Sequence, residues 1–435
     1  MTATRPSSRT PTQAATPSGD SNPPRAAVVA VRRLFAAETP EYFMLLGTTL
    51  FLVVFGLVMV LSSSSIESYV NTKDFFTTAT RQGLYALIGV PIMLIAARVP
   101  ISFWKRWARI AVFAGIGLQL LVFSPIGFSV QGNRNWIHLG SFSAQPSELV
   151  KLAFVVWLAW VLTNRRDILD DWKRIALTIG PLAGIAIGLV LAGSDLGTSI
   201  ILVSIVFGAL FFAGTRPRIM LTAFVIISIV GTVFVLIRPS RLSRVQAWLG
   251  GCTDPAQQNQ ACYQISHGWQ ALAHGGVFGV GLGNSTGKWS WVPEADNDFI
   301  FSIIGEELGL VGGILVLLMF VLLAICFIRI IRMSRDPFAK IATSAAMVWI
   351  VGEAFVNIGV VLGFLPVLGV PLPLVSAGGS ALITSLAAIG VVLSFARTRP
   401  DPDDVDGSFS AVQRSSSRRP SRTSASDATR GRDLP

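Results

Sequence analysis

Long apolar runs alternate with short polar segments along most of this chain. Runs of about 20 apolar residues are long enough to cross a bilayer as helices. We expect such runs near residues 43–63, 82–98, 107–124, 147–163, 175–193, 196–213, 219–238, 299–328, 341–362 and 379–396. Backbone polar groups find no water in lipid, so each run must satisfy its own hydrogen bonds as a helix. The pattern predicts an all-α polytopic membrane protein with about ten transmembrane helices.

Basic residues are concentrated after every second apolar run. They are Lys105, Arg106, Arg109, Arg165, Arg166, Lys173, Arg174, Arg216, Arg218, Arg329, Arg332, Arg335, Lys340, Arg397 and Arg399. The positive-inside rule predicts that these loops are cytoplasmic. Both termini are then cytoplasmic, and residues 239–298, between helices seven and eight, form a large extracytoplasmic loop.

The two ends of the chain differ in composition from its centre. Residues 1–40 and 399–435 are rich in Ser, Pro, Thr, Arg and Asp and have too few apolar residues to bury a core. We therefore expect two disordered cytoplasmic tails around a membrane domain of residues 41–398. The first tail lacks the apolar core of a cleavable signal, so the first helix is expected to remain as an anchor. Either tail is simply solvated, or the C-terminal one docks a partner around residues 414–422.

Composition narrows the function classes. The chain is 52% hydrophobic and 14% charged, with a net charge of +11 that the basic loops and tails explain, so we expect no nucleic-acid binding. The histidines are His138, His267 and His274, and no cysteine or carboxylate cluster completes a ligand set, so no metal site is predicted. The glycine-rich run 275–287 fits neither common phosphate-loop pattern.

Four polar or Gly/Pro-rich breaks converge on the side predicted to be extracytoplasmic. They are residues 125–146, 193–198, 239–298 and 363–379. Loops held by a rigid scaffold are where binding sites tend to form, so we expect the site on this side. Asp195, in the second break, is most simply interpreted as a helix cap.

The stretch 292–309 brings acidic side chains to the start of a membrane helix. Asp298 lies where the polar loop ends, and Glu306 and Glu307 lie about two turns further on. Acids inside a membrane cost about 2.5–3.5 kcal/mol each at a helix centre, so they suggest a function. Asp298 either takes part in proton transfer or caps the helix. Glu306, Glu307 and Glu353 are predicted to form hydrogen bonds between helices.

Residues 145–151, QPSELVK, open the fourth apolar run. Glu148 and Lys151 are three positions apart and share a helix face. This motif is either a capped helix with its own ion pair, or it presents Lys151 as a positive charge below the membrane surface. In the second interpretation, Arg134 and Lys288 join it in binding an anionic head group such as a diphosphate.

Cys252 and Cys262 bracket a polar stretch of the large loop. A disulfide is chemically allowed outside the cytoplasm, and two free thiols are the alternative. Cys326 lies in an apolar run and is expected to pack there.

Several motifs together resemble one family. They are Trp136-Ile137 with Leu139-Gly140, QPSELVK at 145–151, DLGT at 195–198, GLGNSTGKW at 281–289, PEADNDFIFSIIGEELG at 293–309 and NIGVVLGFLPVLGVPLPLVSAGGS at 357–380. With them the chain resembles the SEDS family (shape, elongation, division and sporulation) over roughly residues 40–397. Residues 288–289 and 297–299 are more similar to the division members than to the elongation paralogue, and the polar tails and cysteine pair resemble actinobacterial versions. Ser194, Asn135 and Ala377 depart from the family's usual proline, arginine and tyrosine.

The resemblance implies a peptidoglycan glycosyltransferase in the plasma membrane at the division septum. It would polymerise lipid II into β-1,4 glycan by inverting displacement of undecaprenyl diphosphate. The family's essential acid corresponds to Asp298, which would be the general base, and its helix-four lysine corresponds to Lys151. Glu148 and Asp195 also match the family's polar positions and are expected to take part in substrate binding. Lys151, Arg134 and Lys288 are the candidates for binding the diphosphate.

The resemblance also implies partners. These are a class B penicillin-binding transpeptidase and, through the tails, other proteins of the division machinery. No cofactor is identified in the sequence, although a divalent cation would suit the diphosphate. The alternatives are a lipid II flippase, a septal scaffold and the elongation paralogue.

Overall fold

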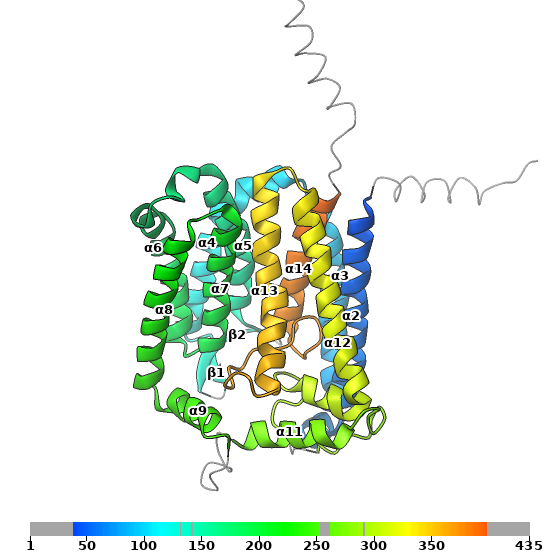
Figure 1. The fold of residues 1–435 in the computed structure, drawn as a ribbon. Helices are drawn as coiled ribbons and strands as arrows, with labels where there is room; N and C mark the ends of the chain where they lie inside the picture. The colour runs from blue at the N-terminus through cyan, green and yellow to red at the C-terminus, as the bar shows by residue number, and fades with distance from the viewer. Residues whose placement is uncertain (1–37, 131, 141, 253–261, 290–291, 398–435) are drawn as a thin grey trace, which may run out of the picture. The chain divides into compact units, whose positions relative to one another are not determined.

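The computed structural model of the chain describes residues 38–130, 132–140, 142–252, 262–289 and 292–397 (Figure 1). Apart from residues 38–40, the two predicted tails lie outside the described residues, as does the middle of the large loop, 253–261. The long helices all belong to the compact unit that begins at Thr39.

The described part of the chain contains ten helices long and apolar enough to cross a membrane, which confirms the predicted fold class. They are α2 (Pro40–Thr72), α3 (Thr77–Ala96), α4 (Ile101–Leu120), α5 (Pro146–Asn164), α6 (Trp172–Ala192), α7 (Leu196–Ala213), α8 (Pro217–Ile237), α12 (Ile300–Met333), α13 (Pro337–Val361) and α14 (Gly379–Ala396). The chain is a multi-pass membrane protein.

The helices α5, α13 and α14 form the centre of the bundle. Most of their residues are buried, whereas α8 buries none and packs mainly on the elements next to it in sequence. Around the centre, α3 packs on α14, α4 on α5, α7 on α5 and α13, and α12 on α2 and α13. A residue on α5 or α13 is therefore held rigidly from several sides.

The two ends of the bundle differ in chemistry. At one end, Lys105 pairs with Asp336 at 2.5 Å and Arg216 with Asp170 at 2.8 Å, in loops predicted to be cytoplasmic. A short 3-10 helix, η2 (Arg166–Ile168), lies in one of these loops. The four polar breaks meet at the opposite end, which we call the loop end (Figure 1).

The loop end contains regular structure that was not predicted from the sequence. The turn η1 (Leu121–Phe123) leads into an antiparallel sheet of β1 (Gly127–Val130), β2 (Asn133–Leu139) and β3 (Phe142–Ala144), in that order. Two helices, α9 (Pro239–Leu249) and α11 (Tyr263–Gly275), lie along the large loop. The strands are only three to seven residues long, too short for a clear alternating pattern.

The helix α12 is broken at Gly309, where φ is 68° and ψ is −165°. The glycine-rich loop after α11 packs on the break: Val280 N–H donates to the Glu306 carbonyl at 3.0 Å, and Leu310 N–H donates to the Gly276 carbonyl at 2.9 Å. Irregular backbone at membrane depth is tolerated where protein groups satisfy it. The apolar run 299–328 was predicted as one continuous helix. The structure interrupts it at Gly309, where the glycine-rich loop supplies hydrogen bonds to the backbone on both sides of the break.

Candidate active site

The carboxylate of Asp298 is not used for capping. The residue lies two positions before α12, whose N-cap is Phe299 and has no side-chain cap bond. Asp298 is half-buried, and within the described ranges its carboxylate accepts no hydrogen bond. Of the two interpretations from sequence, the structure therefore leaves the side chain available for chemistry.

The backbone around Asp298 is fixed by α13 and by the loop that follows it. The carbonyl groups of residues 296–298 each accept one hydrogen bond from these elements. The donors are Ala377 N–H (2.8 Å, to Asp296), Ser376 Oγ (2.7 Å, to Asn297) and Asn357 Nδ2 (2.8 Å, to Asp298). Asn357 Nδ2 also donates to the Val370 carbonyl at 2.7 Å, so the acid and the loop 363–378 are held as one unit.

The same loop contacts both Asp298 and an arginine of α9. A Cβ built on Gly369 would lie 3.5 Å from Oδ2 of Asp298, so the loop backbone faces the carboxylate. Two residues earlier, the Val367 carbonyl accepts a 3.5 Å hydrogen bond from Nη1 of Arg244. Arg244 and Asp298 are therefore brought to one short segment, although they are far apart in sequence.

A second arginine of α9 fixes the helix to the break between α6 and α7. Arg241 is buried, and its Nη2 donates to Oδ1 of Asn133 at 2.9 Å and to the Ser194 carbonyl. The next residue, Asp195, caps α7 as predicted, accepting Thr198 N–H at 2.9 Å. Burial raises the pKa of Asp195, against the hydrogen bonds from Thr198 and the positive charges of Lys151 and Arg241.

The environment of Asp298 favours proton uptake near neutral pH. Burial, and then the negative charge of Glu294, raises the pKa of Asp298 to about 7. Asp195 and Asp296 add to the rise, while Arg244 opposes it. A general base works best when its pKa lies near the working pH, and such shifts are typical of functional sites.

Lys151 lies deeper, inside the bundle, between two carboxylates. Its Nζ is 2.9 Å from Glu148 and 3.0 Å from Glu353, and all three side chains are buried. Trp349 donates to Glu353 at 2.7 Å, and its ring centroid lies 5.2 Å from Nζ of Lys151. The predicted ion pair of QPSELVK is thus present, and Glu353 joins α13 to α5 as a hydrogen-bonding group, as predicted.

The other two predicted cations are engaged at different places. The guanidinium of Arg134 donates to the carbonyl groups of Val122, Phe123 and Ser124 at 3.1, 3.4 and 3.1 Å. Lys288 donates to the Gly283 carbonyl and lies 3.7 Å from Glu307. In the described part of the chain, none of Lys151, Arg134 and Lys288 forms an ion pair with Asp298.

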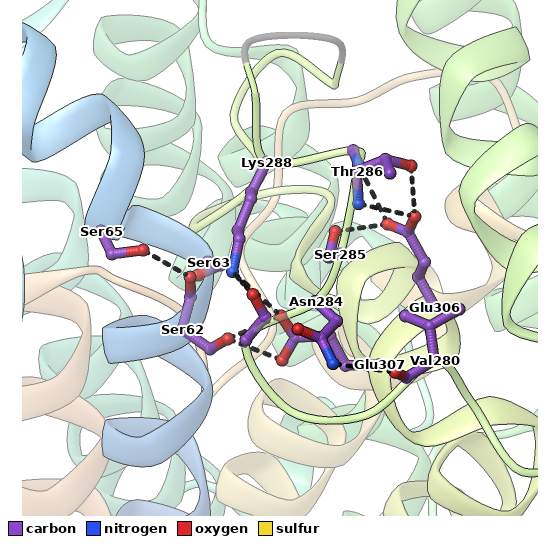
Figure 2. A network of polar contacts seen from close by, with 12 residues as sticks. Ser62, Ser63, Ser65, Val280, Asn284, Ser285, Thr286, Lys288, Glu306 and Glu307 are labelled. Atoms are coloured by element: carbon purple, nitrogen blue, oxygen red, sulfur yellow. Dashed lines mark hydrogen bonds and ion pairs between the residues drawn. The ribbon is translucent and has the colours of Figure 1, made fainter.

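Glu306 and Glu307 anchor the glycine-rich loop to α12 and α2 (Figure 2). Glu306 accepts bonds from Ser285 Oγ, from Thr286 N–H and Oγ1 at 2.9 and 2.8 Å, and from Gly287 N–H at 3.1 Å, and it contacts His274 Nδ1 at 3.0 Å. Glu307 accepts bonds of 2.6 and 2.7 Å from Ser62 Oγ. Both acids therefore have the hydrogen-bonding role predicted for them.

The two loop cysteines are joined. Cys252 and Cys262 form a disulfide with a Cα–Cα distance of 5.3 Å, which ties the end of α9 to the start of α11. Cys326 is free and buried. Within the described ranges, no three His, Cys, Asp or Glu side chains are placed to hold a metal ion.

Four residues of this site, Arg241, Arg244, Asn357 and Ser376, were not predicted from the sequence. One usable signal was present for the arginines, because they lie three positions apart in a loop predicted to be extracytoplasmic, where arginine is disfavoured. Asn357 and Ser376 lie in the motif 357–380, but the motif does not indicate their role, because that role depends on contacts with a distant part of the chain.

A family model described as "Cell cycle protein", covering FtsW, RodA and SpoVE, matches residues 43–400. This chain belongs to that family. The match extends across all ten helices and the loop end, and it agrees with the SEDS resemblance of the motifs.

Curated relatives are similar over most of their length. The probable peptidoglycan glycosyltransferase FtsW of Mycobacterium tuberculosis is 36% identical over 362 residues, 83% of this chain and 68% of that protein. The protein of the same name from Geobacter metallireducens is 36% identical, over 78% of this chain and 90% of that protein. Stage V sporulation protein E of Bacillus subtilis is 34% identical, over 83% and 98%.

Solved structures share the fold. A chain from a peptidoglycan synthase complex, studied for its coordination of polymerization and crosslinking, has a TM-score of 0.67 and 26% identity, covering 82% of this chain and 98% of that chain. The rod shape determining protein RodA of Thermus thermophilus has a TM-score of 0.60 and 24% identity, and the match covers 82% of this chain and 96% of that chain. At this identity the likeness shows the fold alone.

Proposed function

We propose that this chain is a peptidoglycan glycosyltransferase that polymerises lipid II at the division septum, with Asp298 as its general base. The family membership and the relatives named FtsW support the activity. The observation that carries the assignment of the base is the half-buried carboxylate of Asp298, which accepts no hydrogen bond within the described residues and has a pKa raised to about 7 by burial and by Glu294.

The reaction needs one base and one anion-binding group. In lipid II the disaccharide is α-linked to undecaprenyl diphosphate, and the glycan product is β-1,4-linked, so a single displacement inverts the anomeric carbon. The acceptor hydroxyl gives its proton to Asp298 and forms the new C–O bond, while the bond to the diphosphate breaks and its electron pair leaves with the diphosphate oxygen. General-base catalysis of this kind contributes about 10²–10⁴-fold.

The proposal includes a transpeptidase partner. The similar chain from a peptidoglycan synthase complex supports a class B penicillin-binding protein beside this chain, with other division proteins around them. The proposal also allows a divalent cation to bind the diphosphate of the substrate. No residue of this chain is assigned as a ligand of that cation.

A polymerisation assay tests the function. The purified chain, with and without its cognate transpeptidase, is given lipid II in detergent, and glycan strands are separated by length. The proposal predicts glycan that disappears in Asp298→Asn. A wild-type complex that moves lipid II across a bilayer but makes no glycan would instead indicate a flippase.

A further inference from the structure

The leaving diphosphate needs a cation, and those predicted from sequence are already engaged. Lys151 lies between two carboxylates, Arg134 donates to three carbonyl groups, and Lys288 is held by a carbonyl and by Glu307. Recruiting any of them would leave a carboxylate or carbonyl oxygen without its partner, which is costly when the group is buried. The anion site is therefore to be sought in another positive group near Asp298.

Arg244 is such a group. Its side chain is half-buried, and its one hydrogen bond within the described residues is a contact of 3.5 Å from Nη1 to the Val367 carbonyl. That distance is at the long limit for a hydrogen bond, and a guanidinium has five N–H donors in a planar fork. Most of the donors of Arg244 are thus available for a ligand.

Arg244 and Asp298 lie near the same loop and influence each other electrostatically. Burial has the largest effect on the pKa of Asp298 and raises it, and the charge of Arg244 opposes that rise, so the two groups are close enough to interact. No salt bridge joins them in the described part of the chain. In an inverting displacement the base and the leaving group lie on opposite sides of the reacting carbon, so the base and the cation that binds the leaving group must not be paired with each other.

The helix that carries Arg244 is fixed on two sides. Arg241 bonds to β2 and to the break before α7. Trp248 Nε1 donates to the Gly363 carbonyl at 2.9 Å, in the loop that also faces Asp298. Arg241 is buried and already bonded, whereas Arg244, one turn further along, keeps its donors. The two neighbours hold α9 so that Arg244 is positioned relative to Asp298 before a ligand binds.

We propose that Arg244 binds the diphosphate of the lipid-linked sugar donor, on the far side of the reacting carbon from Asp298. This inference rests on the proposed function. As the bond from the anomeric carbon to the diphosphate breaks, the electron pair moves onto a phosphate oxygen, and the guanidinium stabilises that charge. A planar guanidinium can donate to two phosphate oxygens at once, which an ammonium cannot do with the same geometry.

A binding experiment with a matched control tests the assignment. Wild type, Arg244→Gln, Arg244→Lys and Arg238→Gln are prepared in complex with the cognate transpeptidase. Arg238 is exposed at the start of α9, with its guanidinium 5.7 Å from the Phe234 ring centroid, so its replacement removes the same charge at another place. Binding of undecaprenyl diphosphate and of undecaprenyl monophosphate is measured for each, together with lipid II polymerisation.

The expected result is a preference for the diphosphate that depends on Arg244. Wild type and Arg238→Gln should prefer it over the monophosphate about 10-fold or more, since charge-assisted bidentate bonds are strong. Arg244→Gln should lose this preference, and Arg244→Lys should keep part of it. The pH midpoint of polymerisation in Arg244→Gln should also rise, because the group that lowers the pKa of Asp298 is gone.

Two results would overturn the inference. One is an equal diphosphate preference in Arg244→Gln and Arg238→Gln. If Arg244→Gln does not fold, the other is wild-type diphosphate binding in Arg244→Lys. The proposed function is tested separately, by glycan synthesis in the wild-type complex. If the wild type makes glycan, the function stands even when Arg244 proves not to bind the diphosphate. If the wild type makes no glycan, the function fails, and the binding data alone decide whether Arg244 binds the diphosphate.

Discussion

Asn357 donates a 2.8 Å hydrogen bond from Nδ2 to the backbone carbonyl of Asp298, across 59 positions of sequence. The same Nδ2 donates to Val370, so one amide joins α13, the loop after it and the proposed base. The position of Asp298 therefore depends on the most buried part of the bundle. Because Asn357 is buried, we expect it to position Asp298 rather than to touch the substrate.

Replacing Asn357 should impair catalysis more than folding. In Asn357→Leu the carbonyl groups of Asp298 and Val370 lose their donor, and the backbone before α12 can shift. Misplacement of a reacting group by about 1 Å can lower turnover by about 10²-fold, so we expect a fall of at least about 10-fold in polymerisation. The measurement is the initial rate of glycan synthesis at saturating lipid II.

A second buried polar residue of α13 provides the control. Ser344 donates to the Lys340 carbonyl at 2.7 Å, near the opposite end of the helix. Ser344→Ala should be destabilised to an extent similar to Asn357→Leu, but its rate of glycan synthesis should stay at the wild-type value. Equal rates in Asn357→Leu and Ser344→Ala would show that Asn357 has only a structural role.

The rate should depend on pH with a midpoint near neutrality. The reactive form of Asp298 is the carboxylate, and burial together with Glu294 raises its pKa to about 7, so activity at low substrate should rise as pH increases through about 7. Glu294→Gln removes a charge that disfavours ionisation, so its midpoint should be lower. A wild-type midpoint near the ordinary aspartate value of about 4 would contradict the environment of the carboxylate in this structure.

Replacing Lys151 should reduce stability strongly. Lys151→Met leaves Glu148 and Glu353 buried without their counter-charge, and breaking a buried pair in this way costs about 3–5 kcal/mol. Thermal unfolding in detergent measures the loss. Adding Glu353→Gln should recover part of it, because one uncompensated charge is removed. If Lys151→Met keeps wild-type stability but binds donor poorly, Lys151 contacts the substrate instead.

The sequence predicted the membrane helices because long apolar runs have one stable form in lipid. It singled out Asp298 as a candidate base because acids beside a membrane helix are rare, and it predicted the pair of Glu148 with Lys151 from their spacing, which the structure confirms. It did not predict the partners of these residues. Glu353 and Asn357 lie on α13, 202 positions from Lys151 and 59 positions from Asp298 in sequence, and only packing brings them into contact.

The diphosphate site that we propose shows the same limit. Arg134 and Lys288 looked suitable because they are cations near family motifs, but their neighbours in space are carbonyl groups and Glu307. Arg244 was not predicted as a site residue because no feature of the nearby sequence connects it to Asp298. The loop residues Val367 and Gly369 make that connection, and it exists only in the folded chain.

Lipid II polymerisation by Asp298→Asn, in complex with the cognate transpeptidase, tests most directly whether Asp298 is the general base. Asparagine keeps the size of the side chain and can still accept hydrogen bonds, but it cannot take a proton. We predict a folded complex with the thermal stability of wild type and a rate lower by at least about 10²-fold. Glycan synthesis near the wild-type rate by that folded variant would contradict the assignment of Asp298 as the base.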